Sequence, residues 1–92
     1  METTRKNAWL EQYSLKPLDE CERNKLIDGI RNRLNKYKLT QVWVIQRLAD
    51  ENIDTERCEY SSILAGTRRG GKADVIIYRS SALLDDYERR LG

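Results

Sequence analysis

Histidine is absent from this sequence, and cysteine occurs only twice, at Cys21 and Cys58. Two thiols without histidine cannot complete a four-ligand zinc site. Ser-His-Asp and Cys-His catalysis both need a histidine base and are excluded for the same reason. Asp85 and Asp86 are adjacent, so on a helix they point about 100° apart and form no catalytic dyad. We therefore expect a non-enzyme without cofactor or metal, with both cysteines reduced and serving in packing.

Proline, glycine and long apolar runs are also scarce. One Pro and five Gly in 92 residues argue against a loop-rich or low-complexity chain. No apolar stretch is long enough to span a bilayer, and the N-terminus has no secretory signal pattern. A chain of this length forms one domain with a modest core. We expect a soluble, cytoplasmic protein.

The formal net charge of +2 is weak evidence for a nucleic-acid partner, but the charges are unevenly distributed. Acidic residues gather in segments 19–22, 50–59 and 85–88. Basic residues form two acid-free runs: Arg31, Arg33, Lys36 and Lys38, and then Arg68, Arg69 and Lys72. Either run can contact phosphates, or it can be an ordinary solvated surface, and the sequence leaves both interpretations open.

Apolar residues recur at helical spacing along most of the chain, and no alternating pattern predicts a strand. An N-terminal extension, residues 1–18, is expected to contain one or two apolar helical turns before Pro17. Asp19 and Glu22 form a capping-box pattern that starts a helix over about 20–37. Residues 72–91 contain no Gly or Pro and carry a broad apolar stripe, which predicts a long final helix.

The stretch from Leu39 to Lys72 carries the clearest functional pattern. Thr40 suits a helix N-cap, and Leu39 can staple onto Val44. This helix is expected to end near Asn52, with an inner face made of Val44, Ile45 and Leu48.

A second short helix follows in the same stretch. Asp54 or Thr55 can cap its start. Gly66 suits the left-handed position after its end. Its inner face is made of Tyr60, Ile63 and Leu64. Two short helices joined by a turn and followed by a basic loop favour a helix-turn-helix, whose second helix can lie in the major groove.

Three pieces of this stretch carry a family resemblance: Leu39-Thr40-Gln41, the Val44, Ile45 and Leu48 face, and Tyr60 to Gly66 followed by Arg68-Arg69. In this order they resemble the phage-repressor-type (Cro, XRE) helix-turn-helix family, over residues 27–84 of this sequence. The resemblance implies an all-α, four- to five-helix lambda-repressor-like helix-turn-helix domain, residues 19–92, with a long C-terminal helix. It also implies a transcriptional regulator, such as a repressor, of phage or mobile-element origin that binds double-stranded operator DNA as a homodimer.

The candidate DNA-binding residues lie at the start of the first helix, on the outer face of the second, and in the basic loop. They are Thr40 and Gln41; Thr55, Arg57, Cys58, Glu59, Ser61 and Ser62; and Thr67, Arg68, Arg69 and Lys72. Helix starts and the loop can contact phosphates. The resemblance maps base reading onto the outer face of the second helix, where Arg57 is the only strong guanine reader by residue type.

Two features depart from the family pattern and keep other functions open. The link between the two helices is several residues longer than usual, and Glu56 and Glu59 would weaken phosphate binding. With the acidic segment 50–59, they suggest a small protein-interaction module, an antirepressor or an inhibitor of a host protein, on the same scaffold. The plainest alternative is two ordinary packed helices.

Two apolar features have no obvious partner within this scheme. Trp43 projects almost opposite Val44 and Leu48, and we expect the N-terminal segment of Trp9, Leu10 and Tyr13 to cover it, with a partner interface as the alternative. The final helix carries apolar residues on more than one side, namely Val75, Ile76, Ile77 and Tyr78. One side can pack on the helix at 20–37, and another can pair with a second chain.

Overall fold

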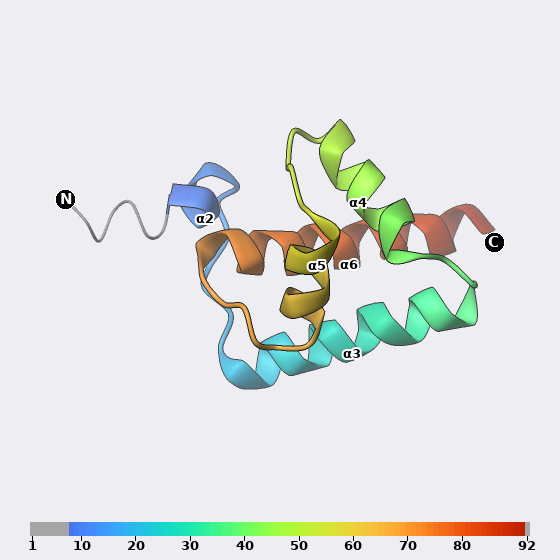
Figure 1. Ribbon diagram of the computed structural model, residues 1–92, viewed down its shortest axis with the longest axis horizontal. Coiled ribbons are helices and arrows are strands. Elements are labelled where there is room, and N and C mark those ends of the chain that lie inside the picture. The colour runs from blue at the N-terminus through green and yellow to red at the C-terminus, as the bar shows by residue number, and fades with distance from the viewer. Residues whose placement is uncertain (1–7, 92) are drawn as a thin grey trace.

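Five helices follow one another in the computed structural model of the protein, which describes residues 8–91 (Figure 1). They are α2 (Ala8–Gln12), α3 (Glu20–Lys36), α4 (Gln41–Asp50), α5 (Arg57–Leu64) and α6 (Gly71–Leu91). No strand occurs within the described residues. The predicted all-α class, with four to five helices and a long C-terminal helix, is therefore confirmed for the described residues.

Local capping residues explain where the first long helices begin. The Asp19 carboxylate accepts a hydrogen bond from the backbone N–H of Glu22 at 2.7 Å, and the reciprocal bond to the Glu22 carboxylate is 3.5 Å long. At the start of α4 the Thr40 hydroxyl accepts from the backbone N–H of Trp43 at 3.1 Å. Each cap satisfies backbone donors that have no partner within the helix, so both predicted starts are confirmed.

Helices α3, α4 and α5 end in the same way, with a left-handed residue that reverses the chain. These residues are Lys38, Asn52 and Gly66, with φ of 57°, 65° and 80°. After α4, for example, the N–H of Ile53 donates to the carbonyl of Leu48 at 2.9 Å, the pairing of a Schellman motif. Only Gly66 was predicted to close a helix in this way.

The start of α5 corrects the sequence prediction. Its N-cap is Glu56, rather than Asp54 or Thr55. The backbone N–H of Glu56 donates to the Glu59 carboxylate at 3.4 Å. The reason lies in Ile53, which is fully buried, so the chain must run inward and return before helical geometry can resume.

Helix α6 is central, because α2, α3 and α4 all pack against it (Figure 1). Its residues Val75, Ile76 and Ile77 have no exposed surface within the single chain. The expectation that one side of this apolar stretch pairs with a second chain is therefore wrong for these three residues. Several helices of the same chain surround this part of α6, and they bury all of its sides.

The predicted N-terminal extension contributes Leu10 and Leu18 to the same core. A buried polar cluster holds it in place, because the Asp74 carboxylate accepts from the backbone N–H of Leu18 at 3.1 Å and from Arg23 at 3.3 Å. Arg23 also donates to the Leu18 carbonyl at 3.1 Å. These bonds join the starts of α3 and α6, and paired groups are what a buried charge requires.

Candidate nucleic-acid interface

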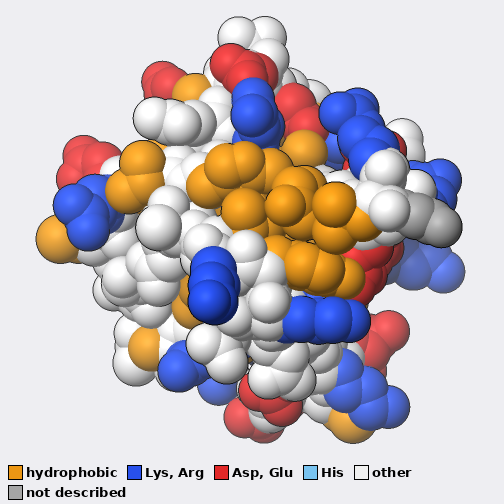
Figure 2. All heavy atoms as spheres, turned by 90° about the vertical axis from the view of Figure 1, so that its right-hand side faces the viewer, with side chains coloured by type: hydrophobic (Ala, Val, Ile, Leu, Met, Phe, Trp, Pro, Cys, Tyr) orange, Lys and Arg blue, Asp and Glu red, His pale blue; other side chains and the backbone are white. Residues whose placement is uncertain are grey.

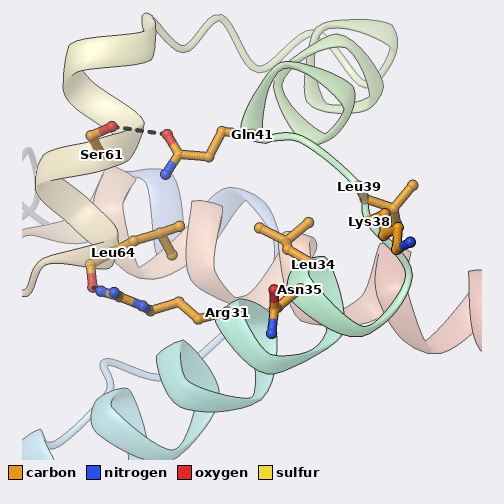
Figure 3. Close-up of a pocket in the computed structure, with 8 residues that line it drawn as sticks. All are labelled: Arg31, Leu34, Asn35, Lys38, Leu39, Gln41, Ser61 and Leu64. Atoms are coloured by element: carbon orange, nitrogen blue, oxygen red, sulfur yellow. Dashed lines mark hydrogen bonds between the residues drawn. The ribbon is translucent and has the colours of Figure 1, made fainter.

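An open cleft of about 480 Å³ lies where α3, α4 and α5 meet (Figure 3). Its walls come from the last turns of α3, the start of α4 and the outer side of α5. The lining residues are Arg31, Leu34, Asn35, Lys38, Leu39, Gln41, Ser61 and Leu64. Buried leucines form its base, and its exposed edges are polar or basic.

Gln41 and Ser61 meet across this cleft, although they are 20 residues apart in the chain. The Ser61 hydroxyl donates to the side-chain oxygen of Gln41 at 2.8 Å (Figure 3). The amide nitrogen of Gln41 keeps two N–H donors, and it points toward the cleft in Figure 3. The structure therefore brings together two of the predicted site residues, and it leaves donors available to an acceptor such as a phosphate oxygen.

One face of α3 supplies basic and amide side chains to the cleft. Arg31 and Asn35 are four residues apart in α3, so they share this face, and Lys38 lines the cleft from the left-handed position just after the helix ends. Arg31 also donates to the carbonyl of Leu64 at 3.5 Å, which brings its guanidinium beside the end of α5. These three residues were not among the predicted site residues, although Arg31 and Lys38 belong to a basic run that the sequence analysis had already singled out.

The first basic run is divided between two sides of α3. Arg33 points to α6, where it bonds to Asp85 and, at 3.2 Å, to the hydroxyl of Ser81. No carboxylate within residues 8–91 pairs with Arg31 or Lys38. Of the four basic residues in this run, the two that line the cleft thus keep charge available to an anion.

Only some of the predicted DNA-binding residues on the outer side of α5 are exposed to solvent. Arg57, Cys58 and Ser61 are exposed. Ser62 turns back and donates to its own helix, at the carbonyl of Cys58, at 2.9 Å. Glu59 is half-buried, and its carboxylate pairs with Lys72 at 3.3 Å. This ion pair holds the Glu59 carboxylate, one of the two acids expected to weaken phosphate binding, toward α6 and neutralises its charge.

The side chain of Thr55 lies in the link before α5, rather than on its exposed face. Its hydroxyl oxygen is buried and has no hydrogen-bond partner among the described residues. The link itself is held by Arg79 of α6, which makes a two-pronged bond to Glu51 at 2.8 and 3.1 Å. This bond raises the pKa of Arg79, so the link is anchored by a permanent charge.

In the loop after α5 only one of the three predicted basic residues is unpaired. Arg69 pairs with Glu20 at 3.4 Å, and Lys72 lies 5.7 Å from the ring centre of Trp9 as well as beside Glu59. Arg68 is exposed and has no ion-pair partner in the part of the chain that the structure describes. Thr67 closes the loop by donating to the Ser62 carbonyl at 3.1 Å.

The burial of Tyr60 sets the orientation of α5. Its hydroxyl donates to Ser80 of α6 at 2.9 Å, and burial raises the pKa of Tyr60 to about 12. Tyr60, Ile63 and Leu64 are all buried, as predicted. Because these three residues face the core, the neighbouring Ser61 is held on the opposite side, toward Gln41.

The prediction that the N-terminal segment covers Trp43 is wrong. Trp43 packs edge-on against Tyr87 near the end of α6, with ring centres 5.4 Å apart, and Arg47 lies over its ring. Trp9 instead packs near Lys72, at the start of α6. The two ends of this 21-residue helix are about 30 Å apart at 1.5 Å per residue, so one short segment cannot reach both.

The described residues contain neither a membrane-spanning helix nor a cluster of potential metal ligands. None of the helices over residues 8–91 combines the length and the apolar character that crossing a membrane requires. No group of three or more potential metal ligands occurs in the same part of the chain. Comparison of the sequence with protein-family models and with curated proteins, and of the structure with solved structures, found no match.

Proposed function

We propose that the protein is a sequence-specific DNA-binding transcriptional regulator, of phage or mobile-element origin, in which α4 and α5 form a helix-turn-helix. The observation that carries this proposal is the hydrogen bond between Gln41 and Ser61. It couples the start of α4 to the exposed side of α5, beside unpaired cations. A helix whose outer side is small and polar can enter the major groove while the helix before it crosses the backbone.

In this arrangement the base readers lie on α5. Arg57 is exposed at its first turn and can donate two hydrogen bonds to a guanine. Ser61 and Cys58 have short side chains, which allow the helix backbone to approach the base edges closely. Base reading therefore rests mainly on one long side chain, Arg57.

Phosphate contacts come from three unpaired cations on both sides of α5. Arg31 and Lys38 line the cleft, and Arg68 follows the end of α5. Gln41 adds neutral donors at the start of α4. Cations that are free of intramolecular carboxylates release counterions from DNA when they bind, so affinity should fall steeply with salt.

The test is an in vitro selection of bound DNA from a random pool at two salt concentrations, using the full chain. We expect one enriched motif that is retained at the higher salt. Removal of two cleft charges in Arg31→Ala with Lys38→Ala should weaken binding to every sequence and lower the salt slope by about 2.

The matched control is Lys16→Ala with Lys25→Ala, which removes the same charge from two exposed residues that do not line the cleft. It should keep most of the affinity and most of the salt slope. Equal losses in the two double variants would show that only net charge matters. Absence of any enriched motif at low salt would refute the proposed function.

A second candidate function is a protein-interaction module, an antirepressor or an inhibitor of a host protein. The exposed acids Asp50, Asp54 and Glu56, which lie just before α5, favour it. A pull-down with the full chain should then recover one stoichiometric partner, and Glu56→Gln should lose it. Recovery of nucleic acid alone, with no change on Glu56→Gln, would exclude this function.

A further inference from the structure

Lys72 and Glu59 form an ion pair between the start of α6 and the first turn of α5. The Lys72 ammonium lies 3.3 Å from one carboxylate oxygen of Glu59 and 3.5 Å from the other. The more distant oxygen also accepts the backbone N–H of Glu56, the N-cap of α5, at 3.4 Å. One carboxylate therefore caps α5 and binds a cation of α6 at the same time.

This ion pair is more enclosed than the cations at the far end of α6. Figure 2 faces that end of the molecule and shows Lys and Arg side chains around an apolar patch. Arg89 and Arg90, near the end of α6, expose 79% and 80% of their side chains. Lys72 exposes 33% and Glu59 only 17%. Because a partly buried ion pair is screened less by salt than an exposed one, it keeps its geometry over a wider range of conditions.

The indole of Trp9, in α2, also contacts Lys72. The ammonium lies over the ring, 5.7 Å from its centre, within the range of a cation–π interaction. The segment that carries Trp9 is fixed in turn, since Leu10 is buried in the core and the Tyr78 hydroxyl donates to the carbonyl of Lys16 at 3.0 Å. Side chains of α2 and α5 thus meet at one ammonium group of α6.

This geometry changes the roles expected of Lys72 and Glu59, both of which were candidate DNA-binding residues. An ammonium that already has a carboxylate partner and an aromatic ring releases few counterions when DNA binds. The Glu59 carboxylate cannot reach a base edge without breaking the ion pair. Arg57, two residues before Glu59 in the same helical turn, is exposed and keeps its donors available.

We propose that Lys72 and Glu59 are positioning residues, whose ion pair fixes the first turn of α5 and thereby the direction from which Arg57 approaches a base pair. The proposal rests on the proposed DNA-binding function and assigns part of its specificity to a contact outside the DNA interface. Without the ammonium, Glu59 would be a largely buried charge with one long hydrogen bond, so it would turn to water and leave the Glu56 N–H uncapped. A two-pronged contact with guanine needs both donors aligned, so this change should reduce discrimination between bases.

The first test measures base discrimination and salt dependence separately, with the full chain and the duplex enriched by selection. Lys72→Met removes the ammonium but keeps a long side chain beside Trp9. It should lower discrimination about fivefold or more at the base pair where Arg57→Ala relaxes preference, and it should leave the salt slope unchanged. Lys72→Arg keeps the charge and should restore discrimination. A direct phosphate contact predicts the reverse, a slope smaller by about 0.9 with full discrimination.

Matched variants separate the ion pair from general charge effects. Lys25→Met makes the same substitution at an exposed residue of α3 and should leave discrimination unchanged. Glu59→Gln breaks the pair from the other side and should also lower discrimination. The double variant with Lys72→Met should lose no more than the larger single loss, because both changes break one contact. Fully additive losses would contradict a shared role.

The second test needs no DNA, so failure of this inference and failure of the proposed function are distinguishable. Hydrogen exchange followed by NMR should show the Glu56 amide exchanging about fivefold faster in Lys72→Met, the change expected for one lost hydrogen bond. The amides of α3 and α4 should exchange as in the wild type, which shows that the fold is kept.

Unchanged exchange at Glu56 in Lys72→Met, or a smaller salt slope with full discrimination, would each overturn the inference. A wild-type chain that enriches no DNA motif would refute the proposed function. Faster exchange at Glu56 would still support the hold of Lys72 on the first turn of α5 in that case.

Discussion

The two sides of α4 differ in polarity and in how their charges are paired. On the side of Gln41 the surface is a polar cleft, and its cations Arg31 and Lys38 have no carboxylate partner among residues 8–91. On the side of Trp43 the surface is aromatic, and its cations are balanced, since Arg47 pairs with Asp50 at 3.6 Å and Arg90 with Asp86. Unpaired positive charge is what the proposed contact with a polyanion requires, whereas the cations on the Trp43 side are already paired with carboxylates of the same chain.

Both sides depend on the same buried residues between them. Val44 and Leu48 have no exposed surface, and they fix the rotation of α4 about its axis. A ten-residue helix therefore needs only two buried anchors, and its two flanks remain available for separate roles. Predictions about the two flanks should differ from each other, whereas a change at the anchors should affect both.

The largest effect is expected for Leu48→Ala, which removes the anchor shared by the two sides. Loss of a fully buried leucine side chain should lower the free energy of unfolding by about 2–5 kcal/mol. Gln46→Ala, on the exposed surface of the same helix, should change it by less than about 0.5 kcal/mol. Urea unfolding measures both, and a similar change in the two variants would contradict the anchoring role.

Helix α5 has the same division into a buried and an exposed side. The pH dependence of the free energy of unfolding tests the buried side. Burial raises the pKa of Tyr60 from the ordinary 10.0 to about 12, so the folded state holds this proton more tightly than the unfolded state. The protonated Tyr60 therefore adds to the free energy of unfolding. This stabilisation is fully present below pH 10 and is lost as the pH rises to about 12, a change of up to about 2.7 kcal/mol.

Tyr60→Phe is the corresponding variant. At neutral pH it should cost about 1 kcal/mol, because the Ser80 hydroxyl loses its partner. Its stability should then fall less between pH 9 and pH 11 than that of the wild type. Urea unfolding at the two pH values measures the difference, and equal losses in both proteins would show that Tyr60 does not titrate in the folded state as described.

Trp43→Ala and Gln41→Ala compare the two flanks of α4 directly. Trp43 is half-buried against Tyr87, so its removal should cost about 2 kcal/mol of unfolding free energy. Gln41→Ala loses one hydrogen bond at the edge of the cleft, worth about 1 kcal/mol or less. For affinity to a duplex carrying a single site, the order should reverse, with Gln41→Ala the weaker binder. The same order in both measurements would argue against separate roles.

The smallest effect on folding is expected for Arg57→Ala, because this side chain is exposed. Unfolding free energy should change by less than about 0.5 kcal/mol. Discrimination at a single base pair should fall by about 1–3 kcal/mol, measured by competition between matched duplexes. Arg57→Lys is the control, because it keeps the charge but loses the paired donors, and it should also lose discrimination.

Much of the helical structure was predictable because its signals are local. Helix α3 was expected over 20–37 and spans 20–36, since the Asp19 cap and the apolar spacing lie within a few residues of each other. The start of α5 was placed at Asp54 or Thr55 instead of Glu56, because neighbouring residues offer competing caps and local signals do not choose between them. The left-handed Lys38 and Asn52 were missed because neither is glycine, the residue that most often takes this conformation.

The candidate site was predictable only in part. Its pattern placed Gln41 and Ser61 in consecutive helices, but it did not indicate which basic residues are available to an anion. That depends on acids far away in the sequence, such as Asp85 for Arg33 and Glu20 for Arg69, which are 52 and 49 residues distant. Trp43 was misassigned for the same reason, since its neighbour Tyr87 lies in another helix.

The sequence by itself determined the helical class, the caps of α3 and α4 and the buried residues of α5, because hydrogen bonding and apolar periodicity act over a few residues. Only the tertiary structure decided which charges are paired and which two helices form the cleft, because electrostatic pairing and packing act between segments that the chain brings together only when it folds. The proposed DNA contacts rest on that second kind of information.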